Sequence, residues 1–138
     1  MTPTQAQLFQ PEIAVHVTAA LISLSLGAYV LFGRKGTPLH RIAGRIWVAA
    51  MVITAASSFF IEGRVLTLAT PWGRFGPIHL LSVAMLWLLL RAIGAIRTGD
   101  VLGHRVRMKG AYLSLAIAGL FTLAPARTLG AWLSSWLA

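Results

Sequence analysis

Four long apolar stretches, each about the length that crosses the hydrocarbon core of a membrane, follow one another along the chain with short breaks between them. They cover residues 11–32, 38–61, 77–98 and 101–124. The mean hydropathy of +0.77 and a share of charged residues of only 11% are outside the usual range of soluble globular domains. The sequence therefore predicts an all-α integral membrane protein, a single domain (residues 1–138) folded as an up-down-up-down four-helix bundle. Residues 125–138 are expected to lie in the membrane interface.

Two related loops join the apolar stretches in pairs. Residues 34–45 and 97–109 both run from an arginine through glycine to a helix-capping residue, and both continue with leucine and a His-Arg pair. The capping residues are Thr37 and Asp100, whose side-chain oxygens can accept hydrogen bonds from the free N–H groups of the first helical turn. The pattern predicts two repeated helical hairpins. Between them, residues 62–76 are rich in proline and glycine, and we expect turns there without a further element.

Positive charge is concentrated at these two loops. Eight of the twelve Lys and Arg residues lie in or beside them, namely Arg34, Lys35, Arg41, Arg45, Arg97, Arg105, Arg107 and Lys109. Cytoplasmic loops of membrane proteins carry such an excess, so we expect both loops at the cytoplasmic face of a bacterial cytoplasmic membrane and both termini outside. The same role accounts for the formal net charge of +9 without nucleic-acid binding. Arg91, near the inner end of the third stretch, is expected to extend its charge to the lipid head groups.

The four histidines fall into two pairs. His16 and His79 are expected near the outer ends of the first and third helices, and His40 and His104 near the inner ends of the second and fourth. These helices are diagonal neighbours in a bundle with short loops, so each pair can point at the bundle axis. Two axial imidazoles are a common ligation for b-type haem, which makes all four histidines candidate iron ligands at two levels roughly 20 Å apart.

Two further features refine the haem hypothesis. Arg41 and Arg105, each directly after an inner histidine, are the expected partners of haem propionates. The absence of cysteine excludes thiolate metal sites, disulfides and covalently attached c-type haem. Two haems b would make the chain an electron-transfer protein or a subunit of a membrane oxidoreductase, with quinol, a small soluble reductant or a redox protein as its partner.

Other functions fit the same residues. A single histidine near the end of a membrane helix is often only an interfacial residue that hydrogen-bonds a carbonyl or a lipid head group. On the outer side, a second set of nitrogen and oxygen ligands could hold Zn, Fe or Mn: Glu12, His16, Glu62 and His79. The alternative hypothesis is therefore a non-redox membrane protein, either a metal-binding transporter component or a structural subunit.

The run from Lys35 to Arg45, KGTPLHRIAGR, is the most specific motif of the chain, and it occurs together with His16, His79 and the His-Arg pair at His104. In this combination the chain resembles an uncharacterised family of small bacterial membrane proteins, the domain of unknown function 2306. The resemblance covers nearly the whole chain and implies a four-span fold, but no chemistry. The use of diagonal helix pairs is also similar to the transmembrane di-haem b-type cytochromes, which is a likeness of architecture alone.

The charge distribution gives a prediction that does not depend on any cofactor. A reporter enzyme that is active only outside the cytoplasm, fused after Ala138, should be active, because both termini are expected on the side opposite to the basic loops. A reporter that fluoresces only in the cytoplasm should stay dark at the same position. The opposite pattern would reverse every assignment of sides made above.

Overall fold

A computed structural model of the chain describes residues 10–61, 68–70, 73–123, 130 and 134. It contains four helices, α2 (Pro11–Phe32), α3 (Pro38–Ser58), α4 (Pro77–Arg97) and α5 (Val101–Thr122), and two short strands, β1 (Leu68–Thr70) and β2 (Gly73–Phe75). Each helix begins at the residue that the sequence predicted, and three of them end one to three residues earlier than expected. The prediction of an all-α four-helix bundle is confirmed.

Local chemistry explains why these helices begin where they do. The Thr37 hydroxyl accepts a hydrogen bond from the backbone N–H of His40 at 3.1 Å, and the Asp100 carboxylate accepts one from the N–H of Gly103 at 2.7 Å. Both residues are N-caps, as the sequence predicted. Gly36 and Gly99, just before them, have φ angles of +78° and +81°, which glycine adopts without strain. The two loops can therefore turn within a few residues.

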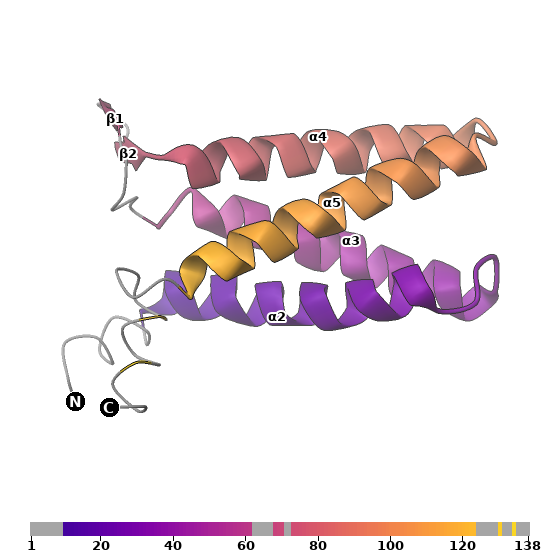
Figure 1. Ribbon diagram of the computed structural model, residues 1–138, viewed down its shortest axis with the longest axis horizontal. Helices are drawn as coiled ribbons and strands as arrows, with labels where there is room; N and C mark the ends of the chain where they lie inside the picture. The colour runs from indigo at the N-terminus through magenta and orange to yellow at the C-terminus, as the bar shows by residue number, and fades with distance from the viewer. Residues whose placement is uncertain (1–9, 62–67, 71–72, 124–129, 131–133, 135–138) are drawn as a thin grey trace.

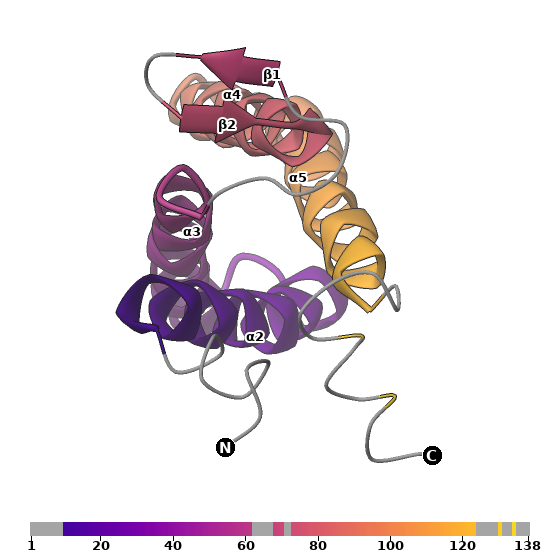
Figure 2. The same cartoon turned by 90° about the vertical axis from the view of Figure 1, so that its left-hand side faces the viewer.

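The helices form two antiparallel hairpins, α2 with α3 and α4 with α5, which are joined side by side (Figure 1). Around the bundle, α3 contacts α4 and α5 contacts α2, so α2 is diagonal to α4 and α3 is diagonal to α5 (Figure 2). Residues 33–37 and 98–100 lie at the same end of the bundle, called here the loop end. The strands and the other helix ends lie at the opposite end, called here the hairpin end. The diagonal arrangement on which the histidine pairs depend is therefore present.

The segment between the hairpins corrects one expectation. We expected residues 62–76 to form only turns, but β1 and β2 pair antiparallel, with Leu68 opposite Phe75 and Thr70 opposite Gly73. The expectation was wrong because two residues between Thr70 and Gly73 are enough for a hairpin connection, and the flanking residues can then pair through their backbones.

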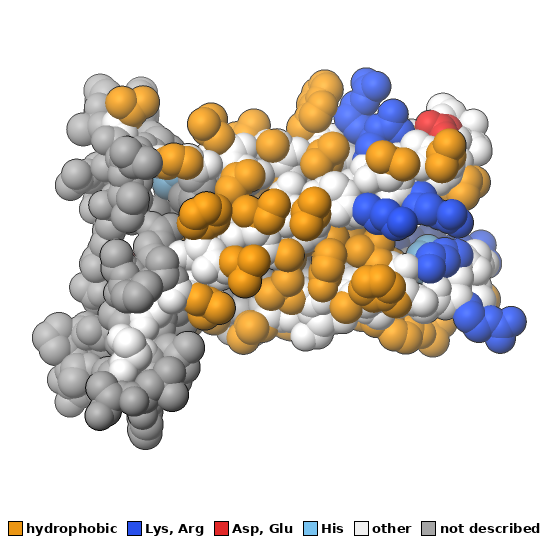
Figure 3. Space-filling view, in the orientation of Figure 1, with side chains coloured by type: hydrophobic (Ala, Val, Ile, Leu, Met, Phe, Trp, Pro, Cys, Tyr) orange, Lys and Arg blue, Asp and Glu red, His pale blue; other side chains and the backbone are white. Residues whose placement is uncertain are grey.

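The surface and the centre of the bundle are both apolar, as a membrane environment requires. Large apolar side chains cover much of the outside, whereas the basic side chains gather at the loop end (Figure 3). Among the described helices, α2, α3 and residues His79–Arg97 of α4 are long and apolar enough to cross a membrane. Helix α5 has similar length but carries Arg105, Arg107 and Lys109 in its first three turns, so its composition is less apolar.

The tightest contact in the centre joins three of the four helices. Trp47 of α3 is fully buried, and its ring lies 6.2 Å from the ring of Tyr112 on α5. Both rings lie against Gly27 of α2, and the Tyr112 hydroxyl donates to the carbonyl of Leu24 at 3.2 Å. A Cβ atom at Gly27 would lie only 2.6 Å from Trp47 Nε1, so glycine allows this approach. The contact therefore ties the two hairpins together.

Replacement of Gly27 by alanine should destabilise the protein, because the new methyl group would overlap both aromatic rings. We expect a loss of about 1 to 3 kcal/mol in the free energy of unfolding. Gly94→Ala is the matched control, because a Cβ there meets no atom within 4 Å, and the exchange should be neutral or stabilising by up to about 1 kcal/mol. Unfolding curves in detergent would measure both, and equal stability of the two variants would contradict this account of Gly27.

Candidate functional site

The two inner histidines both lie at the loop end. His40 lies in the first turn of α3 and His104 in the first turn of α5, on diagonal helices. His40 is within Coulombic range of His104 and, separately, of Lys35. The structure thus places at one end of the bundle two residues that are 64 positions apart in the sequence (104 minus 40).

The His104 ring is held in a defined tautomer. Its Nδ1 lies 3.0 Å from the backbone carbonyl oxygen of Ala92 on α4. A carbonyl oxygen can only accept, so Nδ1 carries the proton and donates it, and in the neutral ring Nε2 keeps its lone pair. Metal-bound histidines commonly make this bond, because it fixes the ring and leaves the other nitrogen for the metal. His104 therefore presents a preformed ligand nitrogen.

The His40 ring is left without such a bond by its own helix cap. His40 is the third residue of α3, after Pro38 and Leu39, and its backbone N–H is satisfied by the Thr37 hydroxyl. Within the part of the chain that the structure describes, no hydrogen bond is made by its ring. Gly44, one turn further along the same face, would meet no atom with an added Cβ, so the space beside this face is open. His40 can therefore turn its ring nitrogens toward a ligand.

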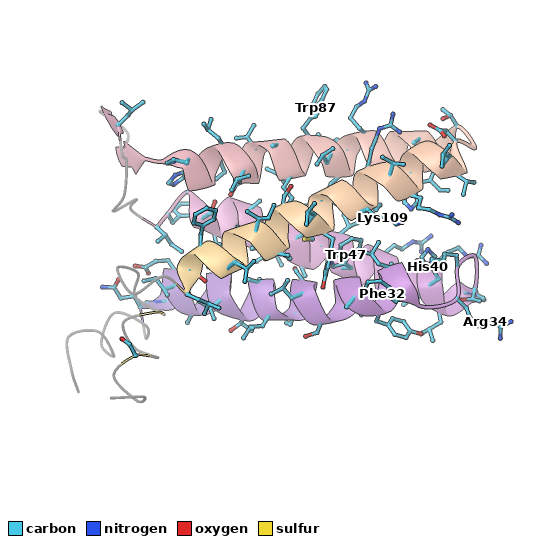
Figure 4. The ribbon with its side chains drawn as sticks, viewed as in Figure 1. Phe32, Arg34, His40, Trp47, Trp87 and Lys109 are labelled. Carbon is cyan, nitrogen blue, oxygen red and sulfur yellow. The ribbon has the colours of Figure 1, made fainter. Side chains whose placement is uncertain are left out.

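Basic side chains follow both histidines on their helices. Arg41 and Arg45 are exposed on α3, and Arg105 and Lys109 are exposed on α5, so both helices carry cations at the same spacing beside the histidine. Figure 4 shows His40 on α3 and Lys109 on α5, both in the half of the bundle toward the loop end. Among the described residues, the acidic residue nearest to these cations in the sequence is Asp100. Its carboxylate lies 3.5 Å from Arg107 and forms no ion pair with any of these four. The site is therefore suited to an anionic ligand and not to a bare cation.

The outer histidine of α2 is also oriented by a hydrogen bond. His16 Nδ1 lies 3.0 Å from the Ser57 hydroxyl of α3. That hydroxyl has one proton and donates it to the carbonyl of Ile53 at 2.7 Å or of Thr54 at 3.1 Å. When the hydroxyl donates to one of these carbonyls, it accepts from His16, and the His16 proton is then on Nδ1 with a lone pair on Nε2. In that arrangement His16 resembles His104.

His79 differs, because its ring serves as a helix cap. The residue is only 4% exposed, and its Nδ1 accepts a hydrogen bond from the backbone N–H of Gly76 at 3.0 Å. The Gly76 carbonyl lies 3.3 Å from the same nitrogen, and the ring of Phe59 packs at 5.6 Å. The shorter bond places the proton on Nε2, whereas an iron ligand needs it on Nδ1. Ligation by His79 would therefore exchange the bond to the Gly76 N–H for the one to its carbonyl.

Comparison with known sequences decides the family. The model of the family described as "Predicted membrane protein (DUF2306)" matches residues 13–136, which is nearly the whole chain. The chain belongs to this family. The resemblance that the KGTPLHRIAGR motif suggested is thereby confirmed. No curated protein and no solved structure matches the chain.

In this member of the DUF2306 family, a group of buried hydroxyls at the hairpin end was not anticipated. Thr54, Ser57, Ser58 and Ser82 are all buried, and the hydroxyls of Ser58 and Ser82 lie 2.9 Å apart between α3 and α4. The sequence offered one signal, the i, i+3 and i+4 spacing of the three residues on α3, which places them around one end of that helix. Hydroxyls in membrane proteins commonly bond across helices in this way.

The metal site that the sequence offered as an alternative to haem on the outer side does not form within the described residues. No three His, Asp or Glu side chains come together there as a metal ion would require. His16 contacts Ser57, and His79 contacts Gly76 and Phe59. Glu62 lies outside the described residues, so the full set of Glu12, His16, Glu62 and His79 stays a prediction.

Proposed function

We propose that this DUF2306 protein is a membrane electron-transfer protein that binds b-type haem between His40 and His104. The observation that carries the proposal is the inner pair itself, two histidines in the first turns of the diagonal helices α3 and α5 at the same end of the bundle. One of them donates its Nδ1 proton to Ala92, and the other makes no ring hydrogen bond within the described residues. Bis-histidine ligation needs two such nitrogens.

The surroundings of the pair support the same ligand. Haem b carries two propionates, and Arg41 and Arg105 follow the histidines directly on the two helices. Below the site, Trp47 and Met108 are buried and apolar, which excludes water from that side. When bound, haem would accept and release single electrons. The protein's part is to hold the His104 proton on Nδ1 through Ala92, to leave the His40 ring unbonded through Thr37, and to supply positive charge at the rim.

A second haem between His16 and His79 completes the proposal. His16 takes the tautomer of an iron ligand when Ser57 donates to the Ile53 carbonyl, and His79 takes it by donating Nδ1–H to the Gly76 carbonyl. With one site near each end of the bundle, the architecture would be similar to that of the di-haem b-type cytochromes. We place the loop end at the cytoplasmic side of a bacterial cytoplasmic membrane, because the exposed cations gather there. Quinol, a small soluble reductant or a redox protein would be the partner.

Absorbance spectra of the purified protein test the inner site. The reduced minus oxidised spectrum should be that of low-spin haem b, and His40→Ala or His104→Ala should remove the inner haem or make it high-spin, because one axial nitrogen is lost. Arg41→Gln and Arg105→Gln are the matched controls. They should keep the haem but lower its reduction potential, since positive charge favours the reduced iron. A colourless, folded protein from cells rich in haem would disprove the proposal.

The outer site makes a separate prediction. His16→Ala or His79→Ala should remove about half of the haem while the inner site stays low-spin, because the two sites lie near opposite ends of the bundle. Quantification of haem per chain would measure the loss. Haem content that stays unchanged in both variants would limit the protein to one haem and leave His79 as a helix cap.

A further inference from the structure

The sequence suggested that Arg91 extends its charge to the lipid head groups at the loop end, but in the structure the side chain points elsewhere. Its side chain is exposed, and the guanidinium carbon lies 5.7 Å from the centre of the Trp87 ring. Trp87 is one turn further from the loop end, because α4 runs from the hairpin end to the loop end. Trp87 is 60% exposed and lies on the side of α4 that faces away from the other helices (Figure 4). The expectation was wrong because α4 ends at the loop end, so its side chains point away from that end.

Helix direction distinguishes Arg91 from the other cations at similar height. Arg45, Arg91 and Lys109 all lie about 9 to 12 Å from the loop end of their helices, at 1.5 Å per residue. The Cα–Cβ bond points toward the helix N-terminus, which is at the loop end for α3 and α5 but at the hairpin end for α4. Arg45 and Lys109 are therefore directed toward the nearer head groups. Arg91 is directed toward the middle of the membrane, where a charge is costly without a partner.

The residues around Arg91 form a continuous exposed stripe. Its members are spaced by three or four positions along α4, so they share one helical face: Leu80, Ala84, Trp87, Arg91 and Gly94. A Cβ at Gly94 would meet no atom, so the backbone is open to close approach there. Small residues beside a polar one are the usual composition of contacts between membrane helices. We call this stripe the Arg91 face.

We propose that the Arg91 face binds a membrane-spanning helix of another protein that carries a carboxylate at the depth of Arg91. A carboxylate would compensate the guanidinium, and Ala84 and Gly94 would let the partner helix come close. A second copy of this chain is a poor occupant, because its three acidic residues, Glu12, Glu62 and Asp100, all lie outside the membrane-centre part of the helices. The proposal does not depend on haem.

Model helices in phosphatidylcholine vesicles test this proposal with the full chain. The probes are three leucine-rich transmembrane peptides of about 23 residues that carry Glu, Gln or Leu at the depth of Arg91. Energy transfer between labelled protein and labelled peptide measures association. We expect the Glu peptide to bind at least about tenfold more tightly than the Leu peptide, with the Gln peptide between them. Arg91→Gln should abolish the preference for Glu, and Arg91→Lys should retain part of it.

Two controls separate the Arg91 face from general effects of charge and folding. Arg97→Gln, at the loop end of the same helix, should leave the preference for Glu unchanged. Trp87→Leu removes the ring that lies against the Arg91 guanidinium and should weaken binding of the Glu peptide several-fold. Circular dichroism should confirm that each variant is folded. Equal binding of the three peptides, or a preference that survives Arg91→Gln, would overturn the proposal. So would Arg91-dependent energy transfer between two labelled copies of the chain without peptide, since the occupant would then be a second copy.

Discussion

The contact of Trp47 with Gly27 and Tyr112 is the point on which the arrangement of the two hairpins depends. Within each hairpin, a short loop already keeps the helices together, whereas the two hairpins are linked by the longer segment 59–76 and are positioned against each other by side-chain contacts. Because Gly27 has no side chain, the indole of α3 and the phenol ring of α5 both reach the backbone of α2. The contact lies between the two histidine levels and therefore sets the relation of α3 to α5, on which His40 and His104 depend.

The sequence predicted where the helices begin but not which faces they bury. Helix starts follow from local chemistry, such as the Thr37 and Asp100 caps and the prolines at the first positions of α2, α3 and α4. Burial could not be predicted in the same way, because lipid-facing and core residues are equally apolar. Leu80 is 73% exposed and Leu89 is 2% exposed, although the two belong to the same helix and are the same residue type. Among the described residues, the buried hydroxyls and His79 are the polar groups that mark the interior.

The same limit of prediction from sequence applies to the candidate site. The sequence grouped His40 with His104 and His16 with His79, according to depth in the membrane. In local geometry His40 and His79 are the equivalent residues, because each is the third residue of a helix that begins with proline. The difference arises one residue before the helix. Thr37 caps α3 with its own hydroxyl, whereas Gly76 has no side chain and its N–H is satisfied by the His79 ring.

The two ends of the bundle therefore differ in whether their polar groups already have hydrogen-bond partners within the protein. At the hairpin end, His16 bonds to Ser57, Ser58 bonds to Ser82 and His79 bonds to Gly76, so these polar groups satisfy one another and hold the helices together. At the loop end, only one nitrogen of the inner pair is used by the protein, and the cations beside it lack acidic partners among the described residues. Polar groups that satisfy one another stabilise a fold, whereas two imidazoles that keep unshared ring nitrogens beside exposed cations can still bind a ligand. That asymmetry is why the proposal of haem binding rests on His40 and His104 and not on the outer pair.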